Sequence, residues 1–125
     1  MEKRTEWLRQ SVYDMNTADF MYQGGRYFYA VFMCHLAVEK ALKGMYYERR
    51  NEIPPKVHNL VYLLGQIGIK PDEQPGKFIV RPNEANIATR YPEDLAQMQQ
   101  EYTETVVKEI LAQAKEFITW IRGQL

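Results

Sequence analysis

The feature that most constrains the fold of this chain is the recurrence of apolar residues every three or four positions in three long segments. That spacing places apolar side chains on one face of an α-helix. The segments cover about 3–23, 26–50 and 92–123. Gly24-Gly25 and Pro54-Pro55 end the first two, because glycine pairs and prolines disfavour continuation of a helix. The pattern therefore predicts three long helices.

Each predicted helix has a stripe of residues expected in a shared core, and the second also has an additional apolar row. The core positions include Val31, Leu42 and Ile110. A helix that is apolar on two faces is either central in a bundle or shared with a partner. We expect the additional row to form a homodimer interface, and it consists of Phe28, Phe32 and Leu36.

The remaining segments predict short helices and a loop. Apolar residues between Leu60 and Ile67 indicate one short helix, and Pro82 can begin another over about 83–89. The glycines and prolines of 68–80 indicate a loop. The sequence thus predicts an all-α fold, an up-and-down bundle of three long and two short helices, in a single domain spanning residues 1–125.

Composition excludes several classes of function. Acidic and basic residues number 16 each, so no overall charge attracts the chain to nucleic acid or membrane. Cys34 is the single cysteine, which rules out an internal disulfide and a cysteine zinc site. We find no cofactor or metal motif, no signal peptide and no membrane span, and we expect a soluble cytoplasmic protein.

The candidate chemistry lies around the end of the second long helix. His58 could exchange a proton near neutral pH, Arg50 could hold a phosphate, and Asn51 could orient the reacting group. Arg49 and Lys56 add positive charge. The alternative is structural: His58 helps to cap the third helix, and the arginines interact with the negative end of the second. Two further sets are interpreted as structural: His35 as a helix-surface or interface residue, and the pair Glu39 and Lys43 as part of a solvated helix face.

Several stretches, in their order and spacing, resemble the HEPN (higher eukaryote and prokaryote nucleotide-binding) family across nearly the whole chain. They are Trp7-Leu8, Gly25-Arg26-Tyr27, Ala37-Val38-Glu39-Lys40-Ala41-Leu42-Lys43, His58-Asn59-Leu60 and Arg90-Tyr91-Pro92. The resemblance implies a bundle of about five helices that forms a homodimer. It also implies a small nucleotidyltransferase as partner, within prokaryotic two-gene systems that include toxin–antitoxin pairs.

The resemblance also bears on catalysis. Family members that cut RNA carry an arginine, a polar residue and a histidine, with four to six residues between arginine and histidine. Arg50-Asn51 matches the opening pair, but seven residues separate Arg50 from His58. This departure counts against metal-independent RNase activity, although a bend at Pro54-Pro55 would absorb an extra residue.

Three functions remain open from the sequence. The first is a dimeric, non-catalytic binding module for a nucleotidyltransferase, which contacts a nucleotide or RNA through Arg49, Arg50, Lys56 and Arg90. The second is a metal-independent RNase toxin that uses Arg50, Asn51 and His58. The third is a purely structural dimeric bundle. Whether the chain is an enzyme is therefore not decided by its sequence.

Overall fold

A computed structural model describes residues 3–69 and 95–125, with side chains from Glu6 onward. The predicted loop and short helix between 70 and 94 lie outside the described residues. Within the described ranges the chain is helical and contains no strand. The helices are α1 (Lys3–Gln23), α2 (Tyr27–Arg50), α3 (Leu60–Ile67), α5 (Leu95–Glu101) and α6 (Glu104–Gly123). The all-α prediction is confirmed.

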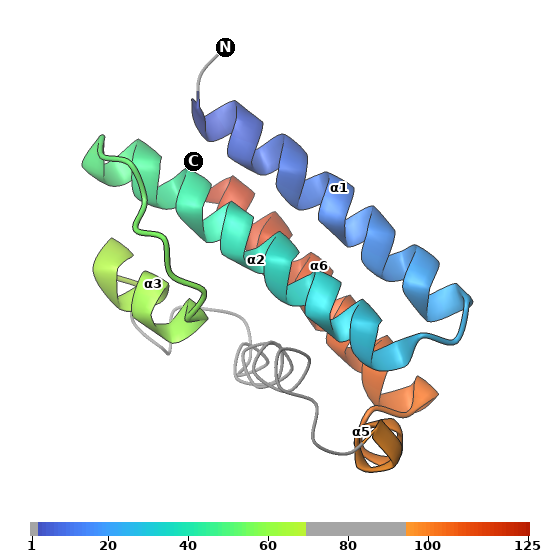
Figure 1. Ribbon diagram of the computed structural model, residues 1–125. Coiled ribbons are helices and arrows are strands. Elements are labelled where there is room, and N and C mark those ends of the chain that lie inside the picture. The colour runs from blue at the N-terminus through green and yellow to red at the C-terminus, as the bar shows by residue number, and fades with distance from the viewer. Residues whose placement is uncertain (1–2, 70–94) are drawn as a thin grey trace.

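Helix α2 is the centre of the bundle. It packs against α1, α6 and α3, whereas α1 contacts α6 less extensively. Figure 1 shows α1 antiparallel to both α2 and α6, which share a direction. Three alanines of α2 are fully buried, and their small side chains let the neighbouring helices pack closely against it. At one of them, Ser11 Oγ of α1 donates a hydrogen bond of 2.6 Å to the carbonyl oxygen of Ala37. A helix covered on three sides explains its near-continuous apolar sequence.

The predicted stripes form one core. Val31 and Leu42 are fully buried, and Ile110 is 4% exposed. Cys34 is also fully buried, and this burial raises the pKa of its thiol well above the usual range. The cysteine is therefore a packing residue, as the sequence predicts.

The predicted last helix, by contrast, is two helices. Residues 95–123 break at Tyr102 and Thr103, between α5 and α6. Thr103 has an extended backbone, and its hydroxyl accepts a hydrogen bond of 3.3 Å from the backbone N–H of Val106. Threonine in that position starts a helix by satisfying a free N–H group. The apolar spacing runs through the break, so periodicity alone does not detect it.

None of the described helices is both long and apolar enough to cross a membrane.

The core position of Phe117 gives a test of this packing. Phe117 is fully buried on α6, so Phe117→Ala should lower the free energy of unfolding by about 3–5 kcal/mol through lost apolar contact and a residual cavity. Urea unfolding measures the change. The neighbouring exposed residue supplies the control, and Glu116→Ala should change stability by less than about 0.5 kcal/mol. Equal effects of the two substitutions would contradict the assigned core.

Candidate functional site

Two arginines at the end of α2 hold the end of α3. Arg50 Nη1 lies 3.2 Å from the carbonyl oxygen of Gln66 and 3.3 Å from its side-chain oxygen, and Arg49 Nη1 lies 3.5 Å from the carbonyl oxygen of Ile67. The last carbonyls of a helix lack partners within that helix and favour cations. The arginines therefore interact with the negative end of α3, whereas the structural alternative placed them at the negative end of α2.

Arg50 has two further neighbours. Its guanidinium carbon lies 5.1 Å from the centre of the Tyr46 ring, and its Nε lies 3.8 Å from Glu52. Tyr46 in turn donates its hydroxyl to Glu52 at 3.4 Å. The Arg50 side chain is still 40% exposed. The guanidinium is thus fixed in orientation while it remains accessible to an anion.

Asn51 ends α2 in a left-handed backbone conformation. Its φ and ψ are 50° and 39°, and its backbone N–H donates to the carbonyl oxygen of Tyr47. Asparagine adopts this conformation more readily than most residues, which accounts for its position after the arginines. The structure therefore gives Asn51 a structural role at the end of the helix.

His58 is held by a carboxylate of α2. Its Nδ1 lies 2.9 Å from Glu39 Oε1, and its side chain is 42% exposed. The segment before it is anchored by Pro54, which is buried, and by Val57, which packs against the core. Asn59 follows as the cap of α3, because its side chain accepts a hydrogen bond from the backbone N–H of Tyr62. His58 therefore lies in the segment immediately before α3, in contact with Glu39 of α2.

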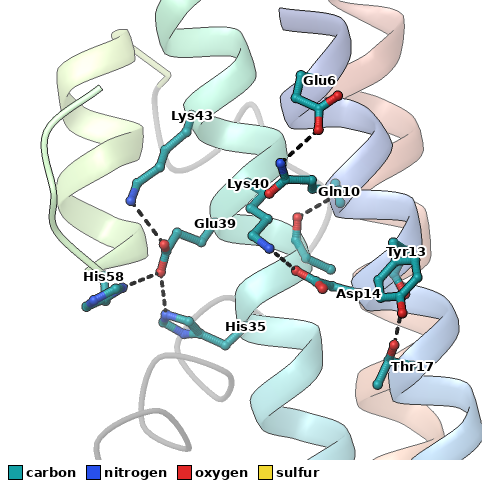
Figure 2. Close-up of polar contacts among 12 residues, drawn as sticks. Glu6, Gln10, Tyr13, Asp14, Thr17, His35, Glu39, Lys40, Lys43 and His58 are labelled. Atoms are coloured by element: carbon teal, nitrogen blue, oxygen red, sulfur yellow. Dashed lines mark hydrogen bonds and ion pairs between the residues drawn. The ribbon is translucent and has the colours of Figure 1, made fainter. Parts of the chain in front are cut away.

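Glu39 is a buried carboxylate that faces three basic side chains. Figure 2 shows His58, His35 and Lys43 pointing toward it. His35 Nε2 lies 3.3 Å from Oε1, and Lys43 Nζ lies 3.0 Å from Oε2. Burial alone would raise the pKa of Glu39, but hydrogen bonds from His35, His58 and Lys43 outweigh it and lower this pKa to about 2. The carboxylate therefore stays ionised at neutral pH.

The burial and mutual contact of these four side chains were not predicted from the sequence. The interpretation placed His35 on the helix surface or at an interface, and Glu39 and Lys43 on a solvated face, whereas they are 0%, 4% and 7% exposed. The correction has a physical basis: α2 is covered on three sides, so even its polar row is buried. A signal was present, because the three residues recur every four positions and thus share one face of a helix whose other residues are mostly apolar.

The structure does not bring Arg50 and His58 together within one chain. Arg50 bonds to the end of α3, and His58 lies immediately before its start. Eleven positions of α2 separate Arg50 from Glu39, the partner of His58, which corresponds to about 16 Å along the helix. Lys56 is exposed between the two positions in sequence. Arg90 lies outside the described residues.

The residues predicted for the dimer interface differ in exposure. Phe28 is 9% exposed and belongs to the core, whereas Phe32 and Leu36 are half-buried. The most exposed aromatic side chains of the described chain lie instead on α1, with Tyr13 at 72% and Phe20 at 74%.

Among the described residues, no group of three histidine, cysteine or acidic side chains could hold a metal ion.

A hollow of about 570 Å³ lies at the other end of the bundle. It is lined by the α1–α2 turn, the start of α2 and the α5–α6 junction, with Arg26, Tyr29 and Tyr102 among its residues. The lining combines aromatic rings with one arginine and Glu104. It shares no residue with the Glu39 cluster.

Comparisons with known proteins identify the family to which this bundle belongs. A family model described as the HEPN domain matches residues 5–124. The chain belongs to the HEPN family. Among solved structures, the HEPN chain is similar to TT1696 from Thermus thermophilus, with a TM-score of 0.80 and 24% identity over 100% of both chains. It is also similar to ST0689, described as an archaeal HEPN homologue, with a TM-score of 0.70 and 22% identity over 99% of this chain and 98% of that one. No curated protein matches.

The lowered pKa of Glu39 predicts a loss of stability in acid. A folded pKa of about 2 lies below the ordinary 4.5, so the unfolded state binds the proton more readily. The stabilisation is complete above about pH 5 and is lost as pH falls toward 2, by about 3 kcal/mol in total. Urea unfolding at pH 5 and pH 3 measures it.

Two variants separate Glu39 from other carboxylates in that experiment. Glu39→Gln should remove about 2 kcal/mol of the difference between the two pH values, because the site no longer titrates. Glu116→Gln, at an exposed position on α6, should retain the wild-type difference. An unchanged difference in the Glu39 variant would contradict the assignment.

The backbone of Asn51 gives a second prediction. Asn51→Gly should leave the free energy of unfolding within about 0.5 kcal/mol of wild type, since glycine accepts a positive φ. Asn51→Ala should lower it by about 1 kcal/mol, because a Cβ strains this conformation. Urea unfolding compares the two variants, and an alanine variant as stable as the wild type would be inconsistent with the cap.

Proposed function

We propose that this HEPN chain is a homodimeric binding module that partners a small nucleotidyltransferase in a prokaryotic two-gene system of the toxin–antitoxin type. In this proposal it contacts the phosphate of a nucleotide or RNA through exposed basic residues, with Arg49, Arg50 and Lys56 as the first candidates. The proposal concerns binding rather than catalysis.

The observation that carries the proposal is the separation of Arg50 from His58. RNA cleavage without a metal needs a proton-transferring group and a phosphate-holding group at one reacting centre, within hydrogen-bond reach of about 3 Å. Arg50 and His58 lie at opposite ends of α3 in one chain. Arg50 nevertheless remains accessible and fixed, which suits recognition of a phosphate by its planar group.

Homodimer formation is supported by the half-buried apolar side chains on α2. Phe32 and Leu36 retain exposure in the single chain, and Tyr29 on the same helix is 50% exposed. Apolar surface of this kind is common at interfaces between copies of a chain. A second copy on this face would cover Phe32 and Leu36, and Phe28 would support them from the core.

A metal-independent RNase toxin is the second candidate, and one observation favours it. His58 is bonded through Nδ1, which leaves its Nε2 as the ring nitrogen available for proton transfer. Arg50 and Asn51 would then have to come from the partner copy, because those of the same chain lie at the far end of α3. Pairing of the two copies would thus complete the centre.

Co-expression with a small nucleotidyltransferase from a neighbouring gene tests the proposal, which expects such a gene beside this one. We expect a homodimer by light scattering, a stable complex with the nucleotidyltransferase, and a labelled single-stranded RNA left uncut by the purified dimer. Arg50→Ala should weaken RNA retention, whereas Arg122→Ala, at an exposed position in the last turn of α6, serves as the matched control.

Three results would contradict the proposed binding function. A monomer that forms no complex with the nucleotidyltransferase would overturn the proposal. RNA cleavage that is lost in both Arg50→Ala and His58→Ala would replace it by the RNase. A dimer that binds neither RNA nor nucleotidyltransferase would leave a purely structural bundle.

A further inference from the structure

We infer that Glu39 is a positioning residue for His58, and that the outward-facing Nε2 of His58 is a contact point for a phosphate group. The inference rests on the proposed phosphate contact and assigns it to a second place in the fold. This place lies at the start of α3, separate from the arginines at its end. Its supporting residues, His35 and Lys43, were not expected from the sequence to take part in any site.

The orientation of the ring follows from the ionised carboxylate. An ionised carboxylate only accepts hydrogen bonds, so the Nδ1 that lies 2.9 Å from Glu39 Oε1 must carry a proton. In the neutral imidazole the other nitrogen, Nε2, then has the lone pair, and in the protonated ring it becomes a donor. Because Glu39 is 4% exposed and the His58 side chain is 42% exposed, the bonded nitrogen faces the core and Nε2 faces outward.

Glu39 is itself held in place by its other partners. Lys43 Nζ lies 3.0 Å from Glu39 Oε2, and Nε2 of the buried His35 lies 3.3 Å from Oε1. The Lys43 ammonium also lies 5.9 Å from the centre of the Trp7 ring on α1. A carboxylate fixed in this way cannot follow His58 if its segment moves, so it sets the ring orientation in the manner of a buried carboxylate behind a reactive imidazole.

The charges around Glu39 favour an anion as the ligand. Lys43 offsets the single negative charge of Glu39, so the cluster carries no net negative charge that would repel an anion at His58. The groups that face His58 are His35, Glu39 and Lys43 on α2, and α3 contributes no acidic or basic side chain. Lys56, exposed two positions earlier, adds a further positive charge. A phosphate oxygen accepts from such donors without a buried charge being left unpaired.

Nitrogen-15 NMR of the imidazole rings tests the inference directly in the full chain. In the wild type, neutral His58 should carry its proton on Nδ1, and its Nε2 resonance should move when inorganic phosphate or a short single-stranded oligoribonucleotide is added at low salt. A response to phosphate alone identifies a free phosphate or nucleotide as the source. A response to the oligoribonucleotide alone identifies a phosphodiester.

A double variant removes the positioning carboxylate without stranding the buried lysine. Glu39→Leu with Lys43→Met replaces an ion pair by apolar side chains of similar size, which core packing tolerates better than one unpaired charge. The tautomer preference of His58 should then be lost, and the apparent affinity for the responding ligand should fall about tenfold or more, as expected for one charge-assisted hydrogen bond.

A second ion pair, between α1 and α2, supplies the matched control. Asp14 and Lys40 lie 2.8 Å apart and are largely buried, and their pairing involves neither His58 nor His35. Asp14→Leu with Lys40→Met should keep both the tautomer and the ligand response. A purely structural role of Glu39 would affect the two double variants alike and would overturn the inference.

The wild-type spectra decide the question even if the Glu39 variant does not fold. A proton on Nε2 in neutral His58, or no response to either ligand, would overturn the inference. Failure to bind a nucleotidyltransferase, with the response of His58 intact, would overturn the proposed function while leaving this phosphate contact standing.

Discussion

The buried carboxylate of Glu39 is the interaction on which the arrangement of the candidate site depends. An ionised group in a helix face with 4% exposure requires partners, since desolvation of an unpaired charge costs several kcal/mol. Its partners come from two places, α2 itself and the segment that leads into α3. The Glu39 carboxylate therefore favours the return of the chain toward α2 after Pro54-Pro55, and it acts together with the buried apolar side chains that pack α3 against α2.

Much of the fold could be predicted because it follows from local spacing. The apolar periods identified α1, α2 and α3 closely, and Gly25, with a φ of 78°, marks the turn between the first two. The core residues of α2 followed from the same pattern. The division of the last segment at Thr103 did not, because the apolar period continues through α5 and α6 and the capping bond depends on a single hydroxyl.

The candidate site could be predicted less well than the fold. Spacing identified Arg50, Asn51 and His58 as residues near one another in sequence, but α3 lies between their contacts in space. The environment of Glu39 depends on how many neighbours cover α2, which is a property of the assembled bundle. Rows of polar residues every four positions are common on exposed helix faces, so only packing distinguishes the buried row from an exposed one.

The attachment of α3 at both ends has a consequence for motion. Its start is tied to α2 through His58 and Glu39, and its end through the two arginines on Gln66 and Ile67. These ties lie about 12 Å apart, the length of an eight-residue helix. Contacts at both ends oppose rotation of α3 about either end. Together with the buried apolar side chains of α3, the two attachments oppose separation of this helix from α2.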